Sequence, residues 1–408
     1  MRRPRVLILT TYYAPVLGGV ETHARVMARW LHDRGCDTLV LATRAGAPPQ
    51  APDQIDGVPV YRVPPAGARR QQAKWLGLPF VFAALVRLRG RYDVVYCPDP
   101  RGIGMAAVAL RALCGKRLVF QAATAGALSC ANWDGPLAQL AIDPDGRCGR
   151  SVKRLGQRVY GAADAYVCIS RAIEREGTAA GIPGRRMLYQ PHGVRLDEFR
   201  PAERDEVGHI RDELGLPRNA VVCLFVGRLS REKGVLDLIE AWRRIGKRAA
   251  LLALAGPEMP GHHLDAGPEV RELIARHGLE DRVRLLGGTD TPARVMRAAD
   301  VFVSPSYYEG FSITLVEAMA CGLAPVVSPV GGIVDYLAPG ENALLCEPGR
   351  PDSLARALDE VVGDRSLRLT LGRGARATAE RHFDSDRMAA RIEALLADVA
   401  RGSGSEAA

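Results

Sequence analysis

Two glutamates, Glu309 and Glu317, stand eight positions apart in the stretch SPSYYEGFSITLVEAMACG. On one continuous helix their side chains would point about 80° apart, at about 100° per residue. The local sequence instead predicts a strand (VFVSPS), a loop (YYEGF) and a helix (ITLVEAMAC), with Ser312 as its N-cap and Gly322 at its end. Glu309 is therefore expected in the loop, and Glu317 little more than one turn inside the helix.

The start of this predicted helix has the chemistry of a diphosphate site. Backbone N–H groups at residues 310–314 have no partner within a helix and lie at the positive end of its dipole. Glu317 could then accept hydrogen bonds from ribose hydroxyls, and Glu309 from sugar hydroxyls. The alternative makes Glu309 a turn acid and Glu317 a solvated helix residue. The neighbours of Glu317 leave little polar face for that alternative: Leu315, Val316, Ala318 and Met319.

A second element, VGRLSREKGV, puts Arg228 and Lys233 five positions apart in a loop that ends at Gly234, between a predicted strand and a predicted helix. A guanidinium offers a rigid fork for phosphate oxygens, and an ammonium offers a point charge. Together the two cations would balance the charge that a nucleoside diphosphate acquires as it leaves. Incidental basic residues in a surface loop are the alternative.

A third element, PVLGG, puts Gly18 and Gly19 after the first predicted strand. There the backbone can approach a ligand closely, and the N–H groups of the following helix point toward it. A plain turn is the alternative, and G-x-G-x-x-G occurs nowhere in the chain. The two D-x-D matches, residues 143–145 and 384–386, follow no predicted strand, so neither a metal nor another cofactor is expected.

The composition is that of a globular protein long enough for two domains. The chain has 408 residues, of which 47% are hydrophobic and 25% charged, and a net charge of +9 at pH 7. This charge suits a nucleic acid, an anionic membrane surface or a phosphorylated ligand, with a coding bias toward Arg and Ala as the alternative. The arginines are scattered and there is no basic tail, and no nucleic acid is expected as a partner. Nine cysteines without a C-x-x-C pair indicate reduced thiols and a cytoplasmic location.

The sequence also bears on membrane contact. The opening MRRPRVLILTTYY has too short an apolar run for a signal peptide, and no segment reaches the ~20 apolar residues of a membrane span. Segment 69–91 combines Trp75 and Phe80 with flanking Arg and Lys. It would rest on the anionic inner face of a membrane or accept a lipid-linked substrate; a buried helix with a basic end is the alternative.

Both halves of the chain alternate continuous apolar runs with amphipathic stretches, which predicts an α/β fold with parallel sheets covered on both faces. We expect two doubly wound, Rossmann-like domains, residues 1–200 and 201–384, with a charged boundary segment near 195–219. Residues 385–408 are expected to form a closing helix with a frayed tail. Such sheets bind ligands at the carboxyl ends of their strands, which predicts a phosphorylated ligand in a cleft between the domains.

The motifs PVLGGVETH, PHGVRLDEF, VGRLSREKG and EGFSITLVE resemble, in this order, those of the retaining glycosyltransferases of family 4, which have the GT-B fold. The resemblance covers nearly the whole chain. It implies a nucleoside-diphosphate sugar bound by the carboxyl-terminal domain and an acceptor bound by the amino-terminal domain. It also implies that the closing helix packs back toward the amino-terminal domain.

Carried onto the matching positions, the resemblance makes Glu309 the acid that contacts the donor sugar and Glu317 the group that holds the ribose. Arg228 and Lys233 would stabilise the leaving phosphates, and Gly19 would approach them closely. The diphosphate would be bound by three successive backbone amides, those of Gly310, Phe311 and Ser312.

One position departs from the family pattern. Many members carry a His at the end of an amino-domain strand, near the donor sugar, whereas the strand RLVFQAATAGALS has Gln121 and Thr124 there. Gln121 can hydrogen-bond a sugar hydroxyl but cannot titrate. His192, where the family usually has Asn, is expected as a hinge or packing residue, with a sugar contact as the alternative. The family's front-face chemistry needs no protein base, because the departing phosphate takes the acceptor's proton and electrostatic stabilisation of the leaving group contributes most.

The sequence thus predicts that a sugar moves, with retention, from a nucleoside-diphosphate sugar to a glycan or lipid-linked acceptor in cell-surface polysaccharide or glycoconjugate synthesis. A sugar-nucleotide epimerase or isomerase on the same scaffold is the first alternative, although the sequence offers no additional acid–base set for it. A non-catalytic nucleotide-sugar binder is the second.

Overall fold

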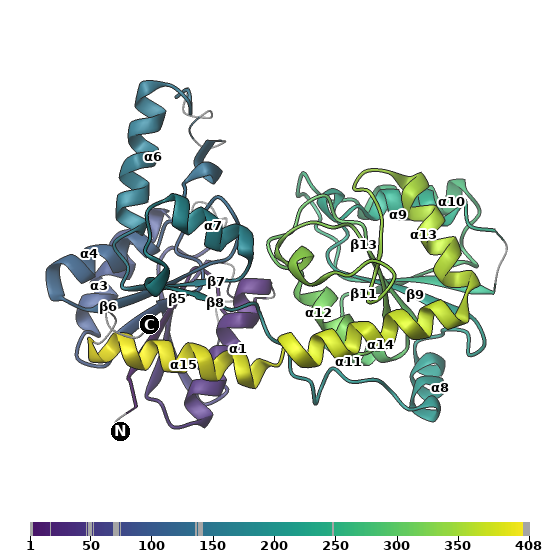
Figure 1. Cartoon of the computed structure of the whole chain (residues 1–408), viewed down its shortest axis with the longest axis horizontal. Helices are drawn as coiled ribbons and strands as arrows, with labels where there is room; N and C mark the ends of the chain where they lie inside the picture. The colour runs from purple at the N-terminus through teal and green to yellow at the C-terminus, as the bar shows by residue number, and fades with distance from the viewer. Residues whose placement is uncertain are drawn as a thin grey trace. The chain divides into compact units, whose positions relative to one another are not determined.

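The computed structural model describes residues 3–402 apart from 17, 46, 48–50, 52, 68–72, 74, 135–136, 138–141 and 247–248. Contacts divide the chain into two compact units (Figure 1). The amino-terminal unit comprises Met1–His192 and Asp386–Ala408, and the carboxyl-terminal unit comprises Gly193–Ser385. Each unit contains one largely parallel sheet with helices, so the predicted pair of Rossmann-like α/β folds is confirmed.

The sheet of the amino-terminal unit has its strands in the order β3-β4-β2-β1-β5-β6-β7-β8, parallel except for the β3–β4 pair. Every residue of β1, β2, β5 and β7 is buried, as expected for parallel strands covered on both faces. The strand order reverses between β1 and β5, and doubly wound sheets bind ligands at the carboxyl ends of the strands beside such a reversal. The strands are β1 Val6–Thr10, β2 Thr38–Thr43, β3 Gln54–Ile55, β4 Val58–Val63, β5 Val94–Cys97, β6 Arg117–Ala122, β7 Ala165–Cys168 and β8 Met187–Tyr189.

The last helix of the chain, α15 (Ser385–Arg401), packs on the amino-terminal unit (Figure 1). Its Met388, Ile392 and Leu396 share one buried cluster with α1 and the central strands, and Trp30 Nε1 donates to Asp386 at 3.2 Å. The predicted return of the closing helix to this part of the chain is confirmed. The other helices of the unit are α1 Gly19–Asp33, α3 Leu78–Arg87, α4 Gly104–Cys114, α6 Arg147–Tyr160 and α7 Arg171–Ala179, with short turns η1 Ala131–Trp133 and η2 Gly184–Arg186.

The carboxyl-terminal unit has an all-parallel sheet in the order β11-β10-β9-β12-β13-β14, around a core that includes the fully buried Trp242. Its order reverses between β9 and β12. The strands are β9 Val221–Val226, β10 Ala250–Ala255, β11 Val283–Gly287, β12 Val301–Ser304, β13 Ala324–Val327 and β14 Leu344–Leu345. The helices are α8 Arg204–Glu213, α9 Val235–Trp242, α10 Gly267–Arg276, α11 Pro292–Arg297, α12 Ile313–Ala320, α13 Pro351–Gly363 and α14 Arg365–His382, with short turns η3 Arg231–Lys233 and η4 Gly332–Tyr336.

Candidate functional site

The loops after β9 and β12, the two strands beside the reversal, bring Lys233 and Glu309 together. Lys233 Nζ donates to Glu309 Oε1 at 2.6 Å, and Ser306 Oγ donates to the same oxygen at 2.9 Å. The side chains of the ion pair are only 22% and 12% exposed. The two residues are 76 positions apart, so the fold and not the local sequence makes this contact.

The backbone holds these two loops in fixed register. Gly234, which follows η3, has φ +68°, and a Cβ there would lie 2.1 Å from the carbonyl oxygen of Pro305. The N–H of Tyr307 donates to the carbonyl of Glu232 at 2.9 Å. Only glycine combines this left-handed conformation with so close a backbone approach. Gly234 therefore lets the Lys233 loop lie directly on the chain that leaves β12.

Arg228 lies in the same loop but contacts a different carboxylate. Its Nη2 donates to Glu232 Oε1 at 2.6 Å, and the two side chains are 51% and 33% exposed. Both predicted phosphate cations are thus held by carboxylates. A diphosphate could replace those carboxylates as a partner without leaving an unpaired charge on the protein, since phosphate oxygens accept the same hydrogen bonds.

The two predicted acids lie on different elements, as the sequence indicates. Ser312 occupies the N-cap position of α12, although its hydroxyl makes no capping hydrogen bond, and Gly322 follows the helix with φ +75°. The side chain of Phe311 packs on Phe383 at a ring distance of 5.9 Å. No acceptor among the described residues meets the N–H of Gly310 or Ser312.

Glu317 is buried in the second turn of α12, with 8% of its surface exposed. Burial, with a smaller contribution from the nearby carboxylate of Glu198, raises the pKa of Glu317 to about 8. Glu317 is therefore not a solvated helix residue. A buried carboxyl that favours its neutral form can both donate and accept hydrogen bonds.

In the amino-terminal unit, Gly18 is the N-cap residue of α1 and Gly19 its first residue. A Cβ at Gly18 would lie 2.2 Å from a carboxylate oxygen of Glu21, which folds back over the start of the helix and is 2% exposed. The glycine thus makes room for an acid that the sequence reasoning did not single out. In this structure that carboxylate lies beside the backbone that the donor phosphates are expected to approach.

Gln121 and His192 belong to one buried network at the carboxyl edge of the amino-terminal sheet. Tyr96 Oη donates to Gln121 Oε1 at 2.5 Å and lies 2.8 Å from His23 Nε2, while His23 Nδ1 lies 3.1 Å from His192 Nδ1. Burial lowers the pKa of both histidines, that of His192 to about 4. His23 is thus a buried imidazole that joins His192 to Tyr96, the hydrogen-bond partner of Gln121.

Thr124 lies beyond β6 in a loop that Glu176 of α7 holds. The Glu176 carboxylate accepts from the N–H groups of Gly126 at 2.8 Å and Ser129 at 2.5 Å. Thr124 itself is half-buried. Sequence reasoning missed both His23 and Glu176. The helical spacing of the apolar residues Ala24, Met27 and Leu31 could have indicated that His23, on the same helix face, is buried.

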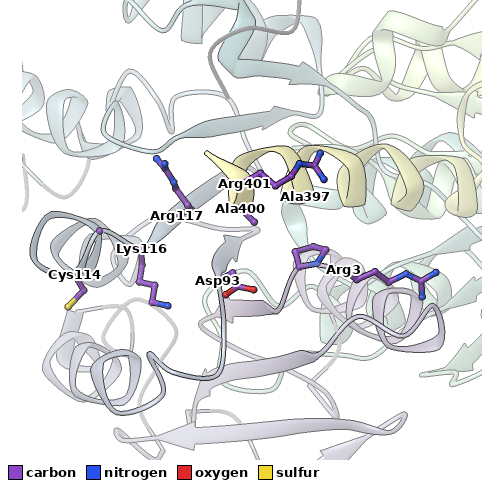
Figure 2. Close-up of a pocket in the computed structure, with 10 residues that line it drawn as sticks. Arg3, Asp93, Cys114, Lys116, Arg117, Ala397, Ala400 and Arg401 are labelled. Carbon is purple, nitrogen blue, oxygen red and sulfur yellow. The ribbon is translucent and has the colours of Figure 1, made fainter. Parts of the chain in front are cut away.

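A pocket of about 410 Å³ lies at the other edge of this sheet (Figure 2). Its lining residues include Asp93 and Lys116, which immediately precede β5 and β6, and Pro4, two positions before β1. Lys116 follows helix α4, and Arg401 is the last residue of helix α15. Cations at these positions offset the negative end of the helix dipole. Asp93 is paired with Arg5 at 2.6 Å. The pocket therefore lies at the amino ends of these strands, whereas the candidate residues of this unit lie at the carboxyl ends.

Among the described residues, no group of three or more His, Cys, Asp or Glu side chains could hold a metal ion. None of the helices in this part of the chain is both long enough and apolar enough to cross a bilayer.

The chain has two Rossmann-like sheets, with cations and helix-start amides after the strands beside the reversal of strand order. This arrangement is that of the GT-B class of glycosyltransferases, which use nucleoside-diphosphate sugars. Residues 18–193 match the glycosyl transferase 4-like domain, and residues 207–378 match the glycosyl transferases group 1 family. The chain belongs to this group 1 family, glycosyltransferase family 4.

Relatives agree with this placement, and a solved structure shares the fold. D-inositol 3-phosphate glycosyltransferase 1 of Catenulispora acidiphila is 31% identical over 381 residues, which cover 88% of this chain and 85% of that protein. The D-inositol 3-phosphate glycosyltransferase of Streptomyces bingchenggensis is 34% identical over 257 residues, 60% of this chain and 55% of that protein, so the match spans about half of that relative. HepE of Anabaena in complex with UDP and glucose has a TM-score of 0.76 at 24% identity, covering 96% of this chain and 99% of that one.

Proposed function

We propose that this glycosyltransferase binds the diphosphate of its donor at the loops after β9 and β12 and transfers the sugar to a hydroxyl of a glycan or lipid-linked acceptor. The Lys233–Glu309 contact of 2.6 Å beside the start of α12 carries this proposal. The donor diphosphate takes the place of Glu309 as the partner of Lys233, and Glu309 becomes available to the hydroxyls of the donor sugar. Arg228 contributes a second cation, and the amides of residues 310–312 bind the remaining phosphate oxygens.

The chemical step then needs no protein base. The bond between the anomeric carbon and the phosphate oxygen breaks, and the acceptor oxygen bonds to the anomeric carbon from the same face. The acceptor's proton passes to the departing phosphate oxygen. Lys233 and Arg228 stabilise the charge on that leaving group, which is the main contribution of the protein.

Several features of the amino-terminal unit support an acceptor held near an anionic membrane, on its cytoplasmic face. Trp75, Leu76 and Phe80 are 48%, 60% and 47% exposed. Trp75 contacts Trp133 at 6.4 Å, and Trp133 contacts Tyr160 at the end of α6 at 6.2 Å. Helix α6 lacks acidic residues and carries four exposed arginines along one stripe: Arg147, Arg150, Arg154 and Arg158. Exposed apolar side chains and a basic helix face in the same unit suit a surface of anionic lipid, as part of cell-surface glycan synthesis. Three basic residues of the predicted segment, Arg69, Arg70 and Lys74, lie outside the described residues.

A panel of sugar nucleotides tests the reaction. UDP-glucose is the first member, because HepE was crystallised with it, and inositol phosphate is among the first acceptors, because the curated relatives are named for it. Release of the nucleoside diphosphate that rises with acceptor, and a product with the donor's anomeric configuration, supports the proposal. Interconversion of the sugar without release would indicate an epimerase, and binding without turnover a non-catalytic binder.

Vesicle sedimentation tests the membrane part separately. We expect the protein to sediment with vesicles that contain phosphatidylglycerol and not with phosphatidylcholine alone, and less so after Arg150→Glu and Arg154→Glu. Equal sedimentation with both vesicle types would contradict an anionic surface.

A further inference from the structure

The pocket at the amino ends of the strands of the amino-terminal sheet has the features of a second binding site (Figure 2). Its lining comes from the start of the chain, the residue before β5, the turn between α4 and β6, and the last turns of α15. All of these belong to the amino-terminal unit, so the pocket lies within one unit. Its volume of about 410 Å³ is typical of small-molecule sites, which span about 300–1,000 Å³.

Two cations of the lining lack a carboxylate of their own. Lys116 Nζ donates to the carbonyl of Tyr92 at 2.7 Å and forms no ion pair with the described residues. Arg117 shares the carboxylate of Asp164 with Arg111, at distances of 3.2 and 2.9 Å. One carboxylate thus serves two guanidinium groups, and the ammonium beside them has only a neutral partner.

A third cation, Arg401, has a partner that is easily exchanged. It pairs with Asp398, one turn earlier on the same helix, and both side chains are 49% exposed. Exposed pairs within one helix contribute little to stability, so an anion could take the place of Asp398. Asp93, the carboxylate of the lining, does not compete for these cations, because it accepts three hydrogen bonds from the Arg5 guanidinium at 2.6–3.2 Å.

The pocket and its partners carry an excess of positive charge. Five cations stand against three carboxylates: Arg5, Arg111, Lys116, Arg117 and Arg401 against Asp93, Asp164 and Asp398. The carboxyl ends of α4 and α15 add about half a negative charge each, which leaves about one positive charge. Arg3 contributes less, because its side chain extends away from the other cations, and its Nη1 lies 3.0 Å from the position of a Cβ at Gly35 (Figure 2).

This chemistry suits a phosphate group attached to a small organic skeleton. Guanidinium groups present paired N–H donors to phosphate oxygens, and an ammonium adds a point charge. Pro4, Ala397 and Ala400 add apolar surface to the lining. A bare phosphate ion would fill only part of the volume, and the apolar surface can contact carbon atoms.

We propose that this pocket binds a small soluble phosphomonoester, with its phosphate held by Lys116, Arg117 and Arg401 and its carbon atoms against Ala397 and Ala400. Arg401 ends α15, whereas Lys116 and Arg117 lie at the start of β6. The bound phosphate therefore ties the end of the closing helix to the amino edge of the sheet. This site is distinct from the proposed donor site and does not rest on the proposed function.

Calorimetric titration of the full chain tests the ligand class, with glycerol 3-phosphate, inorganic phosphate and glycerol as probes. We expect saturable binding of glycerol 3-phosphate, binding of phosphate at least about threefold weaker, and no binding of glycerol. Absence of saturable binding of both phosphates up to about 10 mM would overturn the site. Equal affinity for the two phosphates would overturn the contact with the carbon skeleton.

Variants locate the binding. Lys116→Gln and Arg401→Gln, which retain N–H donors, should each raise the Kd for glycerol 3-phosphate at least about fivefold. Arg276→Gln is the matched control, because Arg276 also ends a helix and pairs with an exposed acid of the preceding turn, Glu272. It should change the Kd less than about twofold, as should Lys233→Ala in the proposed donor site. Melting temperatures show that each variant is folded. Loss of binding in Lys233→Ala alone would place the phosphate at the donor site and overturn the proposal.

Hydrogen exchange tests the tie between α15 and the sheet. Glycerol 3-phosphate at ten times its Kd should slow the exchange of peptides that cover residues 395–402 about tenfold, because opening of this end releases the ligand. Peptides from the end of α10 should be unaffected, and Arg401→Gln should remove most of the protection. Exchange of residues 395–402 that is the same with and without bound ligand would contradict the tie.

Discussion

The two units hold their candidate residues in opposite ways. In the carboxyl-terminal unit, Lys233 and Arg228 each contact a carboxylate, and two loops hold these charges in register. In the amino-terminal unit, the strand ends carry neutral side chains joined from His192 to Gln121. A charged site can exchange a carboxylate for a phosphate, whereas a neutral site distinguishes ligands by the direction of its hydrogen bonds. The two units therefore offer a ligand different chemistry, exchangeable charge in one and directional hydrogen bonds in the other.

Buried ionisable groups extend this contrast. Burial favours the neutral form of each group, which raises the pKa of the acid Glu317 to about 8 and lowers that of the base His192 to about 4. An acid is neutral at low pH and a base at high pH. The pH should therefore act on the stability of the two units with opposite sign.

The largest expected effect is in the carboxyl-terminal unit. Glu317 has a folded pKa of about 8 and an ordinary value of 4.5, so between these values the unfolded chain has released a proton that the folded chain retains. The free energy of unfolding should fall as pH rises through this window, by up to about 5 kcal/mol. Hydrogen exchange of β9 and β12 peptides, compared between wild type and Glu317→Gln, isolates the contribution. A difference in exchange between wild type and Glu317→Gln that stays constant from pH 4.5 to 8 would contradict this contribution of Glu317.

The opposite dependence of the free energy of unfolding on pH should appear in the amino-terminal unit. His192 ordinarily titrates at 6.5 but at about 4 when folded, so the unfolded chain gains a proton that the folded chain excludes. The free energy of unfolding should fall as pH drops from 6.5 to 4, by about 3 kcal/mol. Exchange of β1 and β5 peptides measures it, and His192→Asn should flatten the curve. If the free energy of unfolding of the wild type instead rises as the pH falls, the two units do not respond to pH with opposite sign.

The carboxyl-terminal site is largely predictable because its information is local. A strand, a loop with Glu309 and a helix start are all visible within one short stretch, and the same holds for Arg228 and Lys233. The direct contact between Lys233 and Glu309 is not visible, since it depends on β9 and β12 being neighbours in the sheet. The N-cap position of Ser312 follows from the sequence, but the orientation of its hydroxyl does not.

The amino-terminal site is less predictable because its members come from separate elements. His23 looks like one more residue of an amphipathic helix, and Tyr96 like one more residue of an apolar strand. Only the order of β1, β5 and β6, with α1 packed beside them, brings these side chains to Gln121. The space at Gly18 is filled by Glu21, a side-chain conformation that no spacing rule indicates.

Removal of the Lys233 cation tests whether the charged site performs the transfer. Lys233→Ala should lower kcat/KM about 10²-fold, or about 2.7 kcal/mol, because a cation next to the leaving phosphates is lost. Arg231→Ala is the matched control, since Arg231 lies in the same turn but contacts Glu269 with both side chains exposed. It should change the rate less than twofold. Equal rates for both variants would show that Lys233 has no part in transfer.

The smallest expected effect concerns the backbone contact that holds the charged site together. Gly234 and Gly215 have nearly the same φ, +68° and +64°, but a Cβ meets the Pro305 carbonyl only at Gly234, and nothing lies within 4 Å at Gly215. Alanine should cost both positions a similar left-handed strain of about 1 kcal/mol. Gly234→Ala should cost about 1–2 kcal/mol more in urea unfolding, because the loop must move off the chain after β12. The same displacement should separate Lys233 from Glu309 and lower activity, which Gly215→Ala should leave unchanged. If the two alanines behave alike, the register of the loops does not depend on this contact, and the charged site would be held by its ion pairs alone.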